Sequence, residues 1–347
     1  MKNKIKKINR YSKLFVVFSI LLINKILYFN LFKAEKTNII VEVEIAKSKI
    51  SKGPFQFNKG ITDILPYENN GCKFVSSKKI RPIKSNKIDY FYISLPTFGE
   101  KTYNKWVNVN KANKLILGPN FVPGKWFFFP NNVDWKEKRF SEIINTIKGI
   151  AIHTNRVKNH LAKRSNTTNF IKKYKIIRQC TNLKPNNIKK FEERKIDILF
   201  FEKYSELNRT KQANHLIRLL QNKTQRIKIL KYGYYTRKEM KELANNSKFI
   251  IYFSFYDCGP IGLIEILNHG TILFTHQKEF IIDKKIGFYI PELDKENQIE
   301  SAYKKIMRKI EIINKLKPNT YAIAKKNQEN YKCENALDDL CKGLKNI

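Results

Sequence analysis

The stretch that decides the fold lies in the second half of the chain, where Tyr235–His276 read YTRKEMKELANNSKFIIYFSFYDCGPIGLIEILNHGTILFTH. Two apolar runs, Phe249–Phe253 and Thr271–Thr275, have the length of buried strands, and each follows a helix-like segment, Arg237–Ala244 or Ile261–Leu267. Continuous apolar strands separated by helices are typical of a parallel sheet that is covered on both faces. The stretch therefore predicts an α/β fold.

The same alternation extends in both directions along the chain. A first series of strands is expected at Asn38–Ile45, Ile88–Ser94, Lys114–Leu117 and Gly149–His153, with helices at Phe55–Leu65 and Phe140–Lys148. A second series adds strands at Ile196–Phe201 and Ile227–Leu230, a helix at Lys211–Asn222 and a final helix from Tyr321 to Leu344. Two such series predict two Rossmann-like, doubly wound domains, with the boundary in the polar segment Lys184–Arg194.

The ends of the helices in the deciding stretch carry local signals. Thr236 is an N-cap candidate, and Glu239 three residues later completes a capping box. Pro260 suits the first turn of a helix because it has no N–H to leave unpaired. Gly270 suits the position just after a helix, where a left-handed backbone is common.

The loop between Ser254 and Pro260 follows a strand at its carboxyl end, which is where open α/β sheets bind ligands. The free backbone amides at the next helix start favour an anion. Asp257 and Glu265 flank this start, and carboxylates accept hydrogen bonds from hydroxyls. The residues suit a ligand that is part diphosphate and part sugar, although an ordinary turn with a capping Asp and a solvated Glu fits the same pattern.

These residues resemble the donor-binding domain of GT-B glycosyltransferases, in particular the retaining family-4 (group 1) enzymes. Their signature is a strand that ends in Ser, two residues, an acidic residue, seven residues, a Glu and soon a Gly. The chain has Ser254, Asp257, Glu265 and Gly270 at this spacing. It departs from the family at Asp257, where Glu is usual.

The resemblance implies roles for residues on both sides of the signature. The opening strand and helix, IDILFFEKYSELNRTKQANHLIRLL, imply that Lys203 and either Arg209 or Lys211 grip the diphosphate. Tyr232, within the segment Lys231–Tyr234, falls where the family holds the nucleotide base.

In the signature itself, the resemblance implies that Asp257 holds hydroxyls of the donor sugar and that Glu265 holds those of the ribose. It also implies that the backbone of Gly259, Ile261 and Gly262 faces the donor phosphates.

The activity implied is transfer of a sugar from a nucleoside diphosphate sugar to an acceptor hydroxyl with retention. The chain contains no Asp-x-Asp triplet, so no metal and no cofactor beyond the donor substrate is expected. The acceptor, a glycan, lipid or protein, is left open. Two other functions remain: a catalytically inactive glycosyltransferase-like protein, and a basic protein that binds nucleic acid or an anionic surface.

The first half matches the family only in outline. Gly53-Pro54 resembles the glycine-containing loop that faces the donor, whereas the motif histidine of many members is missing. His153 is interpreted as a structural histidine at a strand end. Trp106, Trp126 and Phe127–Phe129 are interpreted as core aromatics, with a stacking platform for the acceptor as the alternative.

The formal net charge of +38 fits a polyanion partner. The chain is, however, rich in Lys, Asn and Ile together, which an AT-biased genome explains, and its basic residues are scattered. We therefore attribute the positive charge to composition rather than to nucleic-acid binding, and we expect no nucleic-acid partner.

The N-terminus predicts a membrane anchor. Residues 1–13 are basic, and the apolar run Leu14–Phe32 is long enough to span a bilayer in spite of Asn24-Lys25. A cleaved signal peptide is the alternative. The basic tail predicts a cytoplasmic N-terminus and a single-pass membrane protein, on the lumenal side of the Golgi or ER if the source is eukaryotic. The domains then run from 33 to 190 and from 191 to 347.

The five cysteines are odd in number and include no C-x-x-C pair, so buried free thiols are expected rather than disulfides or zinc. Four N-x-[ST] sequons suit a lumenal domain but arise easily in an Asn-rich chain. They begin at Asn166, Asn208, Asn222 and Asn245.

Overall fold

The structure, a computed structural model, describes residues 36–43, 53–76, 89–94, 114–118, 147–155, 158, 174–203, 207–223, 226–254, 260–291, 293 and 295–345. The expected tail 1–13, the expected span Leu14–Phe32 and most of the helix expected at Phe140–Lys148 lie outside these residues. Among the helices within these ranges, none combines the length and the apolar character needed to cross a bilayer.

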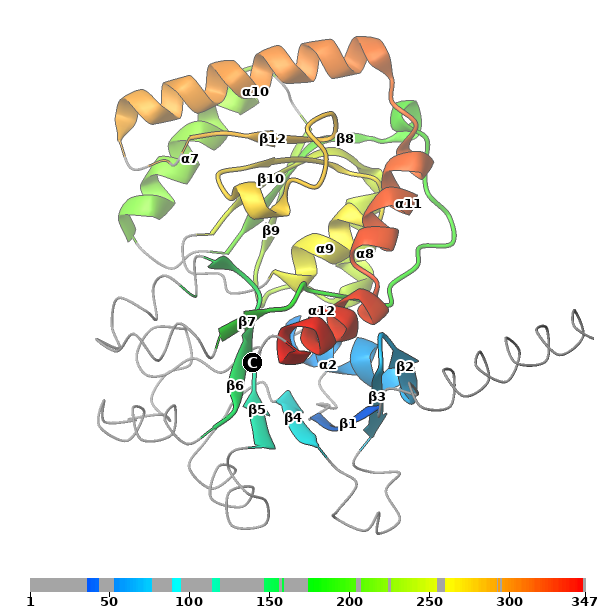
Figure 1. Cartoon of the computed structure of the whole chain (residues 1–347). Helices are drawn as coiled ribbons and strands as arrows, with labels where there is room; N and C mark the ends of the chain where they lie inside the picture. Colours follow the sequence, from blue (N-terminus) through cyan, green and yellow to red (C-terminus); the bar gives the residue numbers. More distant parts are fainter. Residues whose placement is uncertain are drawn as a thin grey trace, which may run out of the picture. The chain divides into compact units, whose positions relative to one another are not determined.

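The second half of the chain contains a five-stranded sheet of order β12-β11-β10-β8-β9 (Figure 1). Its strands are β8 (Ile196–Glu202), β9 (Ile227–Lys231), β10 (Ser247–Phe253), β11 (Ile272–Thr275) and β12 (Gly287–Tyr289). Each neighbouring pair runs parallel. From β8 the chain adds β9 on one side and β10 on the other, so the strand order reverses between β8 and β10. Parallel sheets bind ligands at such a reversal, outside the carboxyl ends of the strands.

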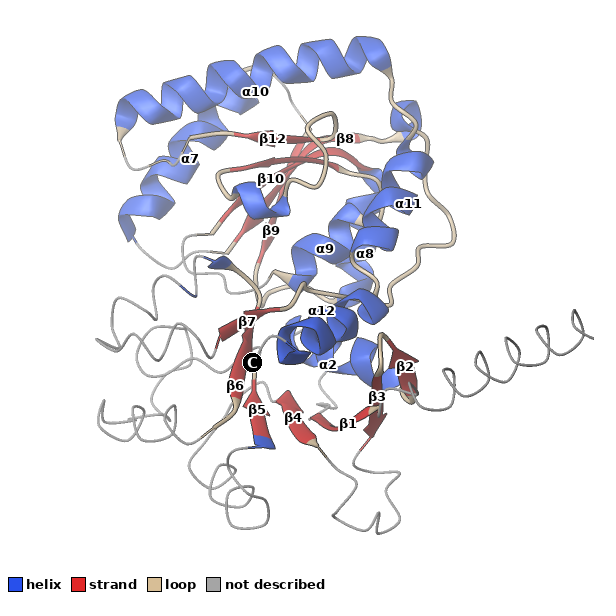
Figure 2. Cartoon of the chain, viewed as in Figure 1, coloured by secondary structure: helices blue, strands red, loops and turns tan. Residues whose placement is uncertain are grey.

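Helices cover both faces of this sheet, as Figure 2 shows. They are α7 (Leu207–Gln221) and α10 (Glu296–Leu316) on one face, and α8 (Arg237–Asn246) and α9 (Ile261–Leu267) on the other. Successive strand residues alternate between the faces: Phe249 and Ile251 pack with the α7 and α10 side, Ile250 and Tyr252 with the α8 and α9 side. Burial on both faces explains why β10 is apolar throughout.

The first half contains a seven-stranded sheet of order β2-β3-β1-β4-β5-β6-β7. Its strands are β1 (Thr37–Val43), β2 (Tyr67–Asn69), β3 (Cys72–Ser76), β4 (Tyr90–Ser94), β5 (Leu115–Leu117), β6 (Gly149–Ile152) and β7 (Tyr174–Ile176). Strands β1, β4, β5 and β6 form a parallel series, as predicted, and β7, which was not predicted, extends it. Helix α2 (Gly53–Asp63) contributes Phe57 and Ile61 to the core beside the sheet.

The antiparallel hairpin of β2 and β3 was not expected. Asn69 pairs with Cys72, which leaves Asn70 and Gly71 as a two-residue loop. Both have positive φ, 52° and 75°, the backbone that a tight hairpin turn requires. The Asn-Gly dipeptide is the sequence signal for this turn.

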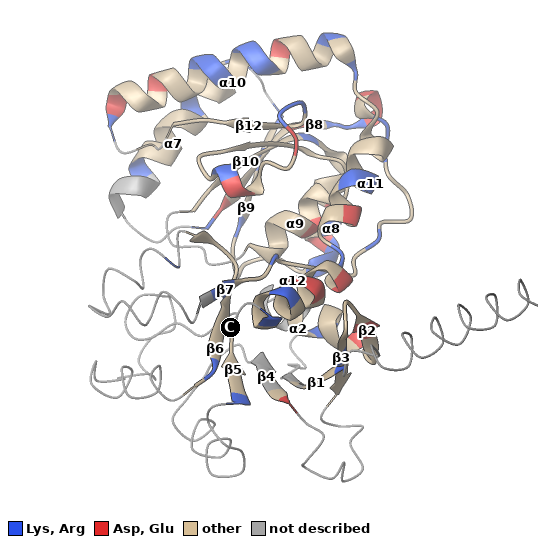
Figure 3. Ribbon diagram, in the orientation of Figure 1, with Lys and Arg blue, Asp and Glu red and all other residues tan. Residues whose placement is uncertain are grey.

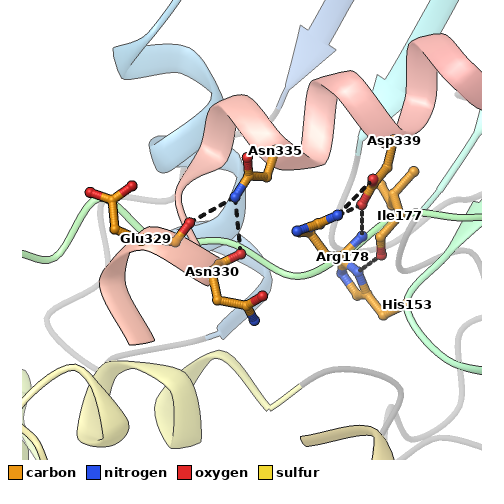
Figure 4. A network of polar contacts seen from close by, with 7 residues as sticks. All are labelled: His153, Ile177, Arg178, Glu329, Asn330, Asn335 and Asp339. Atoms are coloured by element: carbon orange, nitrogen blue, oxygen red, sulfur yellow. Dashed lines mark hydrogen bonds and ion pairs between the residues drawn. The ribbon is translucent and has the colours of Figure 1, made fainter. Parts of the chain in front are cut away.

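The prediction of a single C-terminal helix from Tyr321 to Leu344 is wrong. There are two helices, α11 (Thr320–Asn330) and α12 (Cys333–Lys345). The side chain of Asn335 donates to the carbonyl oxygens of Glu329 and Asn330 (2.8 and 3.2 Å), which satisfies acceptors at the end of α11 and stabilises the turn (Figure 4).

Helix α12 packs in the core of the first sheet, although it lies in the part of the sequence expected to form the second domain. Its Leu337 and Leu340 share one buried cluster with Ile39 and Phe74. Residues Asn38–Ile347 form one compact unit.

The expectation of free thiols is wrong for four cysteines. Cys72 is bonded to Cys341, and Cys180 to Cys333, over sequence separations of 269 and 153 residues. The absence of a C-x-x-C pair excludes only disulfides between neighbouring cysteines. The two observed disulfides join distant cysteines that the fold brings together. Both bonds attach α12 to the part of the chain that precedes the second sheet.

The helix-end signals are confirmed in part: Thr236 caps α8, but the described hydrogen bonds do not include the return bond from the Glu239 side chain that a capping box requires. The hydroxyl of Thr236 accepts a hydrogen bond from the backbone N–H of Glu239 at 3.2 Å. Pro260 is the N-cap of α9. Gly270 has φ of 80°, and a Cβ there would collide with the carbonyl oxygen of Thr320.

Candidate functional site

Two of the predicted site residues lie together at the carboxyl edge of the second sheet. Lys203 follows β8, Tyr232 follows β9, and the Lys203 Nζ lies 4.4 Å from the centre of the Tyr232 ring. The backbone N–H of Tyr232 donates to the carbonyl oxygen of Glu202 at 2.9 Å, which fixes the two strand ends side by side. A cation at the end of β8, which borders the reversal of strand order, therefore lies against an aromatic ring at the end of β9.

Ser254 and Gln277 occupy the same edge after β10 and β11. Both are buried, and the Gln277 side-chain amide donates to the Ser254 carbonyl oxygen. No described residue hydrogen-bonds the Gln277 Oε1. Gln277 was not predicted from the sequence, although its position two residues after a strand of this sheet was a usable signal.

The start of α9 is tightly packed. The first intrahelical bond runs from the N–H of Ile264 to the carbonyl oxygen of Pro260 (3.1 Å). The side chain of Ile261 is 2% exposed and belongs to the core of the first sheet. A Cβ on Gly262 would lie 3.0 Å from the Tyr235 hydroxyl and 3.2 Å from Phe201, so glycine is needed there for packing. Ile261 and Gly262 can serve a ligand only through their backbone.

Glu265 is fully buried one turn into α9 and is not a solvated side chain. Its Oε1 lies 2.5 Å from Arg237 Nη2 and accepts a longer hydrogen bond, 3.4 Å, from the Thr181 hydroxyl. No residue in the described ranges bonds its Oε2. Burial raises the pKa of Glu265 above its ordinary value, and Arg237 acts in the opposite direction.

Arg237 and Thr181 were missed by the sequence analysis. They lie 28 and 84 residues from Glu265 in the sequence, and no local pattern links either to it. Arg237 is the first residue of α8, and Thr181 lies in the segment that connects the two sheets.

The other residues predicted to bind the donor do not form a group among the side chains that the structure describes. Asp257 and Gly259 lie outside the described residues, and so does the side chain of Arg209. Lys211 is exposed on α7. The choice between Arg209 and Lys211, and the role of Asp257, stay predictions.

His153 is buried at the end of β6, as expected for a structural histidine. Its Nδ1 lies 3.0 Å from the carbonyl oxygen of Ile177, and its ring meets Phe57 edge-on at 5.0 Å. Gly53 and Pro54 begin helix α2. The aromatic residues Trp106, Trp126 and Phe127–Phe129 lie outside the described residues.

Across the described part of the chain, no three His, Cys, Asp or Glu side chains are grouped closely enough to hold a metal ion.

No family model and no curated protein matches the sequence. Solved structures do match. HepE (Alr3699) of Anabaena, solved in complex with UDP and glucose, gives a TM-score of 0.53 at 9% identity over 89% of this chain and 99% of its own. Sucrose-phosphate synthase from Thermosynechococcus elongatus gives 0.52 at 8% identity with the same coverage.

TarM of S. aureus, in complex with UDP, gives a TM-score of 0.50 at 14% identity over 74% of this chain. The match spans 55% of TarM, about half of its length. The fold is that of the GT-B glycosyltransferases. The identities are low, so these likenesses establish the fold and not the reaction.

Proposed function

We propose that the protein is a glycosyltransferase that transfers a sugar from a nucleoside diphosphate sugar to an acceptor hydroxyl, with retention and without a metal ion. The observation that carries the proposal is the Glu265 carboxylate. It lies on the helix after β10 in a GT-B fold, one oxygen is held by Arg237, and no described residue bonds the other. The structure of HepE with UDP and glucose supports a donor of this class.

In this reaction the sugar becomes oxocarbenium-like and negative charge accumulates on the departing diphosphate. Lys203, Arg209 or Lys211, and the amides at the start of α9 stabilise that charge; preorganised electrostatic groups of this kind supply the largest single contribution to many enzymatic rates. Asp257 holds hydroxyls of the donor sugar, and Glu265 holds the ribose. The base lies against the segment that includes Tyr232.

Glu265 has no exposed surface, whereas the side chain of Arg237 is 30% exposed. A ribose hydroxyl can reach the carboxylate only when its neighbours, Arg237 above all, shift. Arg237 opposes the burial that raises the pKa of Glu265 and so favours the charged carboxylate, whose Oε2 is the oxygen that a ribose hydroxyl would bond.

The location of the protein is part of the same proposal. Disulfides persist in oxidising compartments and are rare in the cytosol of most organisms, so Cys72–Cys341 and Cys180–Cys333 favour a lumenal or extracellular domain. We propose that Leu14–Phe32 anchors this domain and that the N-terminus is cytoplasmic. The acceptor is a glycan, a lipid or a protein.

The basic residues give less support to binding of nucleic acid. Figure 3 shows Lys and Arg spread over α7, α8, α10, α11 and α12. A nucleic-acid-binding face would gather them in one patch or stripe.

Release of nucleoside diphosphate from UDP-, GDP- and ADP-sugars, without acceptor, tests the activity. We expect slow hydrolysis of one donor. Lys203→Met should slow it about 100-fold, because a cation next to the leaving group is lost. Lys228→Met, which removes an exposed lysine of β9, should leave it unchanged. If no donor is hydrolysed by the parent protein, the inactive glycosyltransferase-like protein is favoured instead.

A further inference from the structure

Two separate chain segments between the sheets are bonded to each other. One follows β7 and contains Cys180 and Thr181; the other runs from Tyr331, just after α11, to Cys333, the first residue of α12. Cys180 and Cys333 form a disulfide, and the N–H of Thr181 donates to the carbonyl oxygen of Tyr331 at 3.0 Å. These bonds fix the backbone of Thr181 against the start of α12.

The surroundings of this disulfide leave little room for movement. Both cysteines are fully buried. A Cβ on Gly60 would lie 2.6 Å from the Cys333 Sγ, and the Asn182 side chain donates to the Gly60 carbonyl oxygen at 2.9 Å. Two residues before Cys180 on the same segment, Arg178 binds Asp339 of α12 through two nitrogens, at 2.7 and 3.1 Å (Figure 4).

Thr181 connects this region to the candidate site. Its hydroxyl oxygen accepts from the N–H of Leu183 at 3.2 Å, and its single hydrogen is directed to the Glu265 Oε1 at 3.4 Å. Since a hydroxyl has one hydrogen, the bond from Leu183 helps to set the direction in which Thr181 donates. The orientation of Glu265 thus depends on the backbone position of Thr181, next to Cys180.

We propose that the Cys180–Cys333 disulfide is a positioning element of the donor site. By holding Thr181 against Tyr331, it directs the Thr181 hydroxyl to Glu265 Oε1 and leaves Oε2 for the donor. This inference rests on the proposed function, because it assigns donor binding to Glu265. The disulfide itself does not contact the donor.

The second disulfide supplies a matched control. Cys72–Cys341 also anchors α12 to the part of the chain that precedes the second sheet, but through strand β3. It closes a loop of 269 residues against 153, so removal of either bond relieves a comparable constraint on the unfolded chain. The two variants should therefore lose similar stability and differ in donor binding.

The experiment measures the dissociation constant of the donor that the parent protein binds, by calorimetry well below the unfolding temperature of each variant. We expect about tenfold weaker binding in the double variant Cys180→Ser, Cys333→Ser and a similar loss in Thr181→Val, because both weaken a hydrogen bond to a carboxylate. A variant that carries all three substitutions should bind the donor no more weakly than the double variant or Thr181→Val, since both act through one contact. Thr181→Ser keeps the hydroxyl and should restore parent affinity.

The control variant Cys72→Ser, Cys341→Ser should bind within twofold of the parent. Equal losses of donor affinity in the two disulfide variants, or parent affinity in Thr181→Val, would overturn this inference and leave the proposed function standing. If the parent binds no donor, the proposed function fails first, and the inference fails with it. Because Thr181→Val retains both disulfides, the result does not depend on the cysteine variants folding.

Discussion

Replacing Arg194 by methionine is expected to lower the free energy of unfolding by about 3–5 kcal/mol. The guanidinium is 1% exposed. It donates to the carbonyl oxygens of Ser247 (2.6 Å), His269 (2.5 Å) and Lys189 (3.3 Å), which come from three different segments. Methionine keeps the apolar stem but removes the Arg194 donor from the buried carbonyl oxygens of Ser247 and His269, whereas that of Lys189 retains the Thr320 hydroxyl at 2.7 Å. Burial lowers the pKa of Arg194 to about 10, so it is still charged at neutral pH.

Arg226→Met is the control, and urea denaturation is the measurement. Arg226 binds Asp197 through two nitrogens, at 2.8 and 2.7 Å, but its side chain is 54% exposed. Exposed ion pairs contribute about 0–1 kcal/mol to the free energy of unfolding, so Arg226→Met should lower it only slightly. If the two variants lost similar free energies of unfolding, Arg194 would not stabilise the contact between these three segments.

Arg237→Met is expected to destabilise the protein by about 2–3 kcal/mol at pH 8, and by much less at pH 5. The substitution leaves Glu265 buried without its cation. Burial already raises the pKa of Glu265 above 4.5, and loss of Arg237 raises it further. Between 4.5 and the raised pKa the folded state binds a proton that the unfolded state has lost, so stability falls as pH rises through this window.

The measurement is the free energy of unfolding of parent and variant between pH 5 and 8. In the double variant Arg237→Met, Glu265→Gln the additional pH dependence should disappear, because glutamine does not titrate. A penalty for Arg237→Met that does not change with pH would contradict the assignment of a buried, charged Glu265.

The second sheet could be predicted closely because its signals are local. The expected helix Ile261–Leu267 is the observed α9, between Pro260 at its start and the left-handed Gly270 after its end. The apolar run of β10 follows directly from burial on both faces. The hairpin of β2 and β3, which was not predicted, has an equally local signal in Asn70-Gly71.

The features that could not be predicted depend on contacts far apart in the sequence. Helix α12 has an apolar face, but that face does not specify which sheet it covers. The pairing of Cys180 with Cys333 requires the fold that brings them together. Similarly, the sequence indicated Glu265 as a site residue, whereas its partner Arg237 is identified only by the packing of α8 against α9.

Thermal unfolding of the parent and of Glu265→Gln with saturating UDP-, GDP- and ADP-sugars tests the central claim most directly. A ligand at 100 times its dissociation constant stabilises the folded state by about 2.7 kcal/mol, which corresponds to a rise of several degrees in the unfolding temperature. The account predicts such a rise for one donor with the parent and a much smaller one with Glu265→Gln. No rise with any donor, or an equal rise in both proteins, would contradict it.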